Sequence, residues 1–92
     1  MFDISVIITA HREGVLAGAT IRSAEKAINY VTDSMNLKVE TIIVLDRSDA
    51  STKNMFQQNF GDKAIIITTD EGDPGQARNR GVEVSSGTFI SF

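Results

Sequence analysis

The stretch "ISVIIT", residues 4–9, is apolar at nearly every position and rich in β-branched side chains. A strand with one wet face alternates apolar and polar residues, whereas a strand covered on both faces is continuously apolar. A second run, "VETIIVL" at Val39–Leu45, is again almost wholly apolar toward its end. These two runs predict strands of a sheet that is covered on both sides.

The residues between the two runs have the period of a helix. From about Leu16 to Asn36, apolar or small residues recur at three- and four-residue spacing, which is one stripe of an amphipathic helix. They are Leu16, Ala17, Ile21, Ala24, Ala27, Ile28, Val31 and Met35. The sequence therefore predicts one long helix between the first two strands.

Two further helices and two further strands are expected downstream. A short helix follows Asp49 or Ser51 as N-cap, with Gly61 as its C-cap. A third strand is predicted at residues 63–68, "KAIIIT". Pro74 then fits the first position of a third helix that runs to about Ser86, and "GTFISF", residues 87–92, reads as a fourth strand. Asp73 is the expected N-cap of the third helix, with Gln76 as the partner of an Asp-type capping box.

This β-α-β-α-β-α-β order predicts an α/β fold with three layers: a mainly parallel four-stranded sheet with helices on both faces. Residues 1–92 are expected to form a single domain without an internal boundary. Right-handed crossovers place the carboxyl ends of the parallel strands at one edge, which is where open α/β sheets bind their ligands.

Composition excludes several classes of function. The net charge is −3 and the pI about 4.9, which disfavours nucleic-acid binding because that affinity depends on clustered positive charge. The chain has no cysteine and one histidine, His11, so thiolate and histidine-rich metal sites are excluded. It shows neither an apolar run of membrane-spanning length nor a basic signal segment, so we expect a cytoplasmic protein, with membrane association left to a longer parent.

Three polar clusters follow three of the predicted strands: "TAHREG" at 9–14, "LDRSDAST" at 45–52 and "DEGDPGQARNRG" at 70–81. The predicted fold brings all three to the same edge of the sheet. This convergence is the main functional signal in the chain.

The first two clusters offer groups that could bind a nucleoside. Asp46 directly follows an apolar strand, so its carboxylate could accept hydrogen bonds from a base or a ribose hydroxyl. The alternative is an Asx-turn or N-cap role for the next helix, a role for which Ser48, Asp49 and Ser51 compete. His11 could stack on a base and Glu13 could bind a ribose hydroxyl, or both could lie in a solvated loop.

The third cluster opens a helix, whose N-terminus favours anions. Arg78 lies one turn in from Asp73 and can turn toward the sheet edge. Arg80 is about 160–200° further round the helix and is expected to face solvent. Asn79 is assigned a structural role and Gly81 close helix packing.

Together these motifs resemble the N-terminal half of the nucleotide-binding domain of the inverting, family-2-type glycosyltransferases of the GT-A fold. "SVIITAHREG" is similar to the opening strand of that family and its loop. "IIVLDRSDAST" is similar to the strand that the family follows with Asp-Asp-x-Ser, with Leu45 in the first acidic position and Asp46 in the second. "GQARNRGVEVSSGTFISF" is similar to the helix with Ala-Arg-Asn-x-Gly and the strand after it.

The resemblance implies transfer of a sugar from a nucleoside diphosphate donor, in the first place a UDP-sugar, to an acceptor hydroxyl. It implies that Asp46 recognises the base, commonly uracil, and that Arg78 helps to hold the nucleotide. The nucleotide-binding residues that it implies are Thr9, Ala10, His11, Glu13, Asp46, Ser48 and Arg78.

The family places an Asp-x-Asp metal motif directly after the last of these strands, and this sequence ends at Phe92, before that position. We therefore expect Mg²⁺ or Mn²⁺ in the intact parent and none bound by these residues, which are also expected to contain no catalytic residue. The 92 residues should be inactive as a transferase, should bind nucleotide weakly, and should self-associate through the exposed sheet edge.

Three other functions share parts of this pattern. A dinucleotide-binding Rossmann domain needs Gly-x-Gly-x-x-Gly after the first strand, and "TAHREGVLAGA" does not supply it. A phosphorylated receiver-like module needs an acidic pair after the first strand, where this chain has one late glutamate. A non-catalytic Rossmann-like nucleotide-binding or assembly module remains open.

Overall fold

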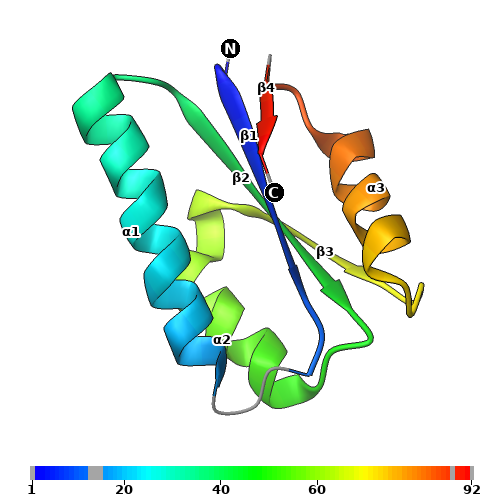
Figure 1. Cartoon of the computed structure of the whole chain (residues 1–92). Helices are drawn as coiled ribbons and strands as arrows, with labels where there is room; N and C mark the ends of the chain where they lie inside the picture. Colours follow the sequence, from blue (N-terminus) through cyan, green and yellow to red (C-terminus); the bar gives the residue numbers. More distant parts are fainter. Residues whose placement is uncertain (1, 13–15, 88, 92) are drawn as a thin grey trace.

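Helices cover both faces of a parallel sheet in this protein. The structure is a computed structural model that describes residues 2–12, 16–87 and 89–91. In chain order the elements are β1 (Ile4–Ala10), α1 (Ala17–Met35), β2 (Val39–Asp46), α2 (Ala50–Phe60), the 3-10 turn η2 (Gly61–Lys63), β3 (Ile65–Thr69), α3 (Pro74–Val84) and β4 (Phe89–Ser91) (Figure 1). The strand order is β3-β2-β1-β4 and every pairing is parallel. The predicted parallel α/β architecture is confirmed.

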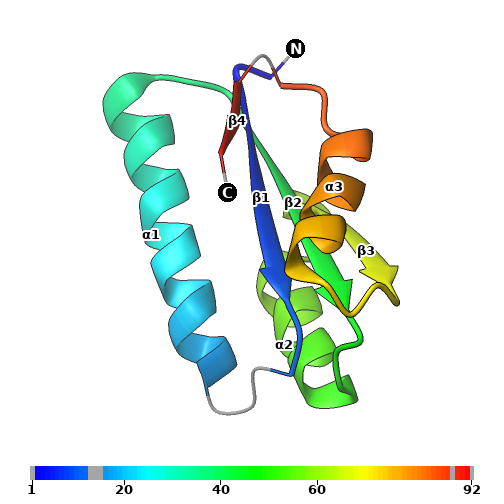
Figure 2. The ribbon, with the colours of Figure 1, turned by 45° about the vertical axis from the view of Figure 1, so that its right-hand side comes forward.

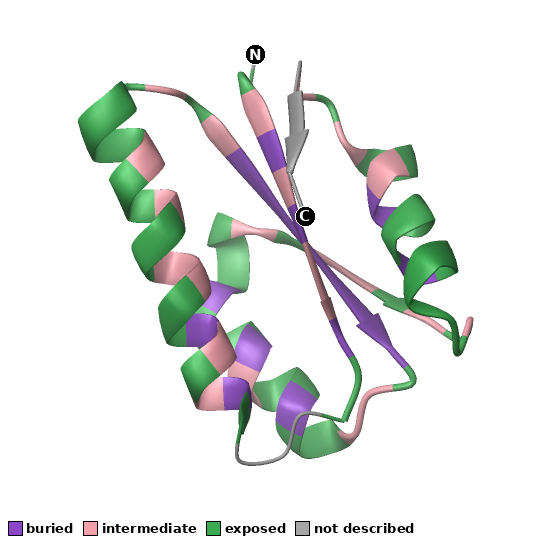
Figure 3. Cartoon of the chain, viewed as in Figure 1, coloured by how far each residue is buried: buried purple, intermediate pink, exposed green. Residues whose placement is uncertain are grey.

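Strand β2 lies at the centre of the core, and its residues from Glu40 to Asp46 are all buried (Figure 3). Its side chains alternate between the two faces of the sheet. Ile43 and Leu45 belong to the apolar cluster under α1 and α2, which also contains Phe56. The other face of β2 is covered as well, so its continuous apolar sequence reflects burial on both faces, as predicted.

The second face is covered by α3. Ile42 and Val44 of β2 pack with Ile7 of β1 against Ala77 of α3. Gly81 of α3 is buried, and a Cβ there would lie 2.6 Å from Cγ2 of Ile7. The expectation that Gly81 permits close helix packing is therefore confirmed.

The predicted caps Asp49, Gly61 and Asp73 are confirmed, whereas no capping-box bond from Gln76 is found among the described residues. The Asp49 side chain accepts a hydrogen bond from the Thr52 N–H at 2.9 Å and caps α2. Gly61 ends that helix with a φ of 46°, and its N–H donates to the Gln57 carbonyl. Asp73 caps α3 by accepting from the Gly75 N–H at 3.0 Å.

Several predicted boundaries were wrong, among them that of the fourth strand, which was expected at 87–92 and is observed at Phe89–Ser91. The third strand was expected at 63–68 but begins at Ile65, because the chain continues past Gly61 as a 3-10 turn before it becomes extended. The third helix was expected to reach about Ser86 but ends at Val84. The Ser86 N–H donates to the Glu40 side chain instead of to a helical carbonyl, which explains the earlier end.

The crossovers create a switch point beside β1. Helices α1 and α2 lead from β1 to β2 and β3 on one face, whereas α3 returns on the opposite face to β4, on the other side of β1 (Figure 2). In such sheets, ligands bind outside the carboxyl ends of the strands at this point.

Within the described residues, no helix has both the length and the apolar character needed to cross a membrane.

Candidate nucleotide-binding site

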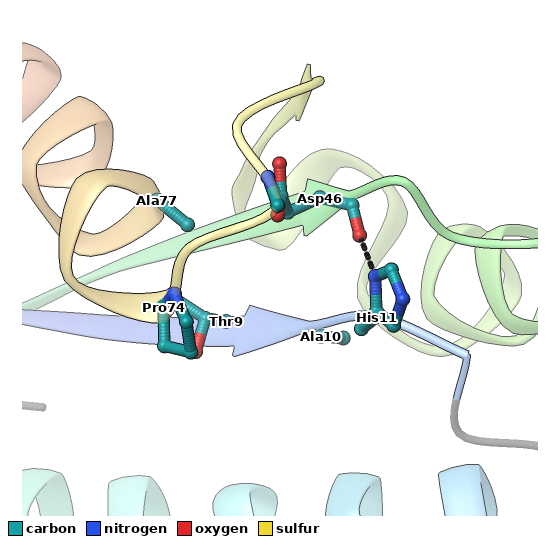
Figure 4. Close-up of a pocket in the computed structure, with 7 residues that line it drawn as sticks. Thr9, Ala10, His11, Asp46, Pro74 and Ala77 are labelled. Carbon is teal, nitrogen blue, oxygen red and sulfur yellow. Dashed lines mark hydrogen bonds between the residues drawn. The ribbon is translucent and has the colours of Figure 1, made fainter.

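A pocket of about 270 Å³ lies at the carboxyl end of the sheet (Figure 4). It is built by three segments that are distant in sequence: the end of β1 with the residue after it, the last residue of β2, and the start of α3 with the loop before it. Its lining residues are Thr9, Ala10, His11, Asp46, Gly72, Pro74 and Ala77. The volume is slightly below the roughly 300–1,000 Å³ of common small-molecule pockets, so it suits a fragment such as a nucleoside.

The structure brings together four of the seven residues that the sequence singled out. Thr9, Ala10, His11 and Asp46 all line the pocket. Ser48 and Arg78 are described but are not among its lining residues, and Glu13 lies outside the described residues.

Sequence reasoning missed three lining residues, Gly72, Pro74 and Ala77. All three fall in the third polar cluster, 70–81, and none of them has a charged side chain. The signal was present in Asp73 and Pro74, since a capped helix start that follows a strand must lie at the sheet edge.

The Asp46 carboxylate is the most heavily bonded group at the site. Its Oδ1 accepts from the Thr69 hydroxyl at 2.8 Å and from the Glu71 N–H at 2.6 Å. Its Oδ2 accepts from the Gly72 N–H at 2.9 Å. The residue is only 6% exposed. Asp46 thus fixes the loop between β3 and α3, which forms one wall of the pocket.

These contacts set the charge state of Asp46. Burial raises the pKa of its carboxyl, but the hydrogen bonds from Glu71, Thr69 and Gly72 and the positive Arg47 more than offset it, so the pKa lies below its ordinary value. Hydrogen bonds to a carboxylate favour its ionised form. Asp46 is therefore an anion and a pure acceptor near neutral pH.

The alternative role considered for Asp46, as a cap of the next helix, is wrong because Asp49 caps α2. Asp46 does have a structural role, but its partners lie 23 to 26 residues further along the chain. No local spacing signals such a contact, which is why the sequence did not predict it.

Two ion pairs hold the same loop from outside. Arg47 Nε lies 2.5 Å from Asp70 Oδ1, and Arg80 Nε lies 2.8 Å from Glu71 Oε1. The hydrogen bond to Glu71 raises the pKa of the Arg80 guanidinium. Arg80 is exposed, as predicted, but its ion pair with the loop was not foreseen.

His11 contacts β2 as well as the pocket. Its Nδ1 lies 2.5 Å from the Asp46 backbone carbonyl (Figure 4). Because a carbonyl oxygen can only accept, Nδ1 carries the hydrogen and donates it. The residue is exposed, so the bond fixes an imidazole ring at the rim of the pocket.

The arrangement can bind a flat, polar group. A carboxylate offers about four acceptor positions, and the loop uses three of those on Asp46, two at Oδ1 and one at Oδ2. One position remains on Oδ2 for a donor from a ligand. Among the described residues, no three His, Asp or Glu side chains gather closely enough to hold a metal ion.

A comparison with known protein families gives a match that covers nearly the whole chain. The model of the family described as Glycosyl transferase family 2 matches residues 5–92. No curated protein and no solved structure matches the chain significantly.

Proposed function

Because the chain belongs to glycosyl transferase family 2, we propose that its sheet-edge pocket holds the nucleoside of a nucleoside diphosphate sugar, the donor for sugar transfer to an acceptor hydroxyl. One observation carries the proposal. Asp46, in the position that the resemblance assigns to base recognition, lies in the same pocket as Thr9 and His11 at the switch point of the sheet.

The free acceptor position on Asp46 favours a particular class of base. Uracil presents a single imide N–H, which one acceptor position on Oδ2 can satisfy. Guanine presents two adjacent N–H donors, which need both oxygens of a carboxylate, and Oδ1 is already occupied by Thr69 and Glu71. We therefore propose a UDP-sugar as the donor.

The other predicted residues take complementary roles. The His11 ring, held by the Asp46 carbonyl, stacks on the face of the base. We propose that the pocket, of about 270 Å³, takes the nucleoside. Ser48 and Arg78 lie outside its lining and would contact parts of the donor that extend beyond it.

The part of the reaction that these residues supply is binding and orientation. A divalent cation, which this family commonly uses, would neutralise the leaving diphosphate when bound. Among the described residues, no three His, Asp or Glu side chains lie close enough together to hold Mg²⁺ or Mn²⁺, so the role proposed for them is binding of the donor.

Calorimetric titration of UDP, GDP and ADP against the 92-residue chain tests the proposal. We expect UDP to bind most tightly, with millimolar to high micromolar affinity. Asp46→Ala should weaken UDP binding about tenfold or more, because it removes both the acceptor and the anchor of the loop. Thr69→Val is the matched control, since it removes one loop contact and leaves the carboxylate in place. It should change UDP affinity by less than about threefold.

Equal affinity for UDP and GDP would contradict the assignment of the base. UDP binding that survives Asp46→Ala would remove Asp46 from the site.

A further inference from the structure

The face of β2 that meets α3 carries an ordered set of side chains. Because strand side chains alternate, Glu40, Ile42, Val44 and Asp46 lie on the same face. The two middle residues pack against Ala77 of α3. On this face of β2, two apolar side chains therefore lie between two carboxylates, and α3 packs on the apolar pair.

Glu40 is bonded as fully as Asp46, at the opposite end of the strand. Its Oε1 accepts from the Ser5 hydroxyl and from the Ser86 N–H, both at 2.8 Å. Its Oε2 accepts from the Ser86 hydroxyl at 3.1 Å. Glu40 is 7% exposed, so this is a buried carboxylate whose partners all belong to β1 or to the segment after α3.

Backbone packing reinforces the Glu40 contacts. The Gly87 N–H donates to the Ser5 hydroxyl oxygen at 2.8 Å. A Cβ at position 87 would lie 2.5 Å from the Ser5 nitrogen, so only glycine lets the chain approach β1 this closely. The segment after α3 is thus tied to the sheet through Glu40 and Ser5.

The two carboxylates hold the two ends of the same helix. Asp46 binds the N–H groups of Glu71 and Gly72, just before α3 begins at Pro74. Glu40 binds Ser86, two residues after α3 ends. Glu40 and Asp46 are six residues apart on β2, which corresponds to about 20 Å along the strand. An 11-residue helix is roughly 16 Å long, so the two carboxylates lie slightly beyond its two ends.

Apolar packing alone holds α3 weakly. Its buried residues are Ala77 and Gly81, neither of which has a large side chain. Val82 adds a partly buried side chain to this contact, but the apolar area covered stays modest, and the stabilisation scales with the area removed from water. The polar contacts at the two ends therefore carry much of the attachment.

We infer that Glu40 and Asp46 form a clamp that positions α3 on the sheet, so that Glu40 controls ligand binding in a pocket that it does not touch. The link is α3 itself, because Gly72, Pro74 and Ala77 of the pocket lining belong to the helix or its leading loop. The part of the inference that concerns ligand affinity rests on the proposed function, whereas the clamp does not.

Amide hydrogen exchange of the 92-residue chain, with and without UDP, tests the clamp through Glu40→Gln. The substitution keeps the shape of the side chain and removes its charge, so the bonds to Ser5 and Ser86 weaken. We expect exchange of the α3 amides from Ala77 to Val84 to accelerate about tenfold or more, while the amides of Ile42 to Val44 stay within about threefold of the wild type. UDP affinity should fall at least about threefold.

Glu83→Gln is the matched control. Glu83 lies on α3 and pairs with Arg80 on the exposed surface, so its loss removes a charge from the same helix without touching the clamp. Exchange and UDP affinity should remain near the wild-type values. Ser86→Ala removes only the hydroxyl that donates to Glu40 Oε2, and a smaller acceleration confined to α3 is expected from it, which provides a test if Glu40→Gln does not fold.

The outcomes separate the clamp from the proposed function. Accelerated α3 exchange in a chain that binds no UDP would support the clamp and overturn the proposed function. UDP binding by the wild type with α3 exchange unchanged in both Glu40→Gln and Ser86→Ala would overturn the clamp. Acceleration spread equally over α3 and β2 would also overturn it, because Glu40 would then support the whole fold rather than one helix.

Discussion

At the scale of single residues, Asp46 combines two tasks that are usually divided. Its carboxylate accepts hydrogen bonds from Thr69 at the end of β3 and from Glu71 and Gly72 of the next loop, and in the proposed function it also accepts one from the nucleotide. A substitution at this residue therefore changes the shape of the pocket and its chemistry together. Loss of binding on removal of Asp46 is informative only beside a variant that changes the loop alone.

Asp46→Asn should release the loop while preserving the size of the side chain. An amide places an NH₂ group where the carboxylate has its second oxygen, so it cannot accept from Glu71 at one position and from Gly72 at the other. We expect the amide protons of these two residues to lose the downfield shifts typical of bonds to a carboxylate and to exchange about tenfold faster or more. Two-dimensional NMR of the labelled chain measures both effects.

Asp70→Asn is the control for that experiment, because it weakens only the exposed ion pair with Arg47. Surface ion pairs contribute little, so the Glu71 and Gly72 amide shifts should stay within a small fraction of their wild-type values. Unchanged shifts in Asp46→Asn would mean that the carboxylate does not hold the loop in solution.

At the scale of elements, the approach of α3 to the sheet depends on a missing side chain. Gly81→Ala places a Cβ 2.6 Å from Cγ2 of Ile7 and 3.2 Å from Cγ2 of Val44. Overpacking of this kind costs about 1–3 kcal/mol. We expect a lower urea midpoint with an unchanged slope.

Gly75→Ala is the matched comparison on the same helix, because the nearest atom to its Cβ would be Asp73 Oδ1 at an ordinary 3.5 Å. Alanine is the better helix former, so this change should leave stability unchanged or raise it by about 0.5–1 kcal/mol. A larger loss of stability from Gly75→Ala than from Gly81→Ala would contradict the close packing of α3.

The elements also show what the sequence could predict. Residues 4–9 and Val39–Leu45 predicted strands covered on both faces, because continuous apolar character is a local property of the chain. Asp49, Gly61 and Asp73 predicted helix ends for the same reason. Each of these sequence patterns lies within the strand, or next to the helix end, that it predicts.

The parts of the site that the sequence did not predict depend on contacts between distant residues. Asp46 and Gly72 are 26 residues apart, and Glu40 and Ser86 are 46 apart. Because side chains alternate along a strand, the sequence does place Glu40 and Asp46 on one face of β2. It does not show that α3 is the helix that covers this face. Tertiary packing supplies that information.

At the scale of the whole molecule, three carboxyl groups link stability to pH. Burial raises the pKa of Glu40, but its bonds from Ser86 and Ser5 more than offset this and lower it. The pKa of Asp46 is lowered in the same way, and that of Asp49 by its bonds from Thr52. Unfolded Asp and Glu titrate near about 3.9 and 4.3, so the unfolded chain binds more protons than the folded chain in this range.

Stability should therefore be fully present above about pH 5 and should fall as the pH drops through the lowered values of the folded state. Urea midpoints measured at pH 7, 5, 4 and 3 check this expectation. Glu40→Gln should flatten part of the profile, because it removes one of the three groups. A midpoint that is constant from pH 5 to pH 3 would contradict it.

The outer strands make self-association a further expectation. Strand β3 ends the strand order on one side, and Ile65 on it is 41% exposed. An outer strand presents backbone groups that can pair with a second chain. We expect an average mass that rises with concentration in light scattering, and less of this rise in Ile65→Lys.

Tyr30→Lys provides the comparison, since Tyr30 is an exposed side chain of α1, away from β3. It should associate like the wild type. A constant monomeric mass across concentrations would contradict edge pairing.

The paired carboxylates of β2 have one more consequence, for the way in which the chain selects its strand alignment during folding. A slip of β2 by one residue would turn Glu40 and Asp46 toward α1 and α2, where Phe56 lies, and leave both anions without donors. Burying an unpaired charge costs far more free energy than replacing one isoleucine by another at the same place in the core. The two acids thus mark the correct alignment of a strand whose interior, "TIIVL", would otherwise fit its neighbours nearly as well when displaced.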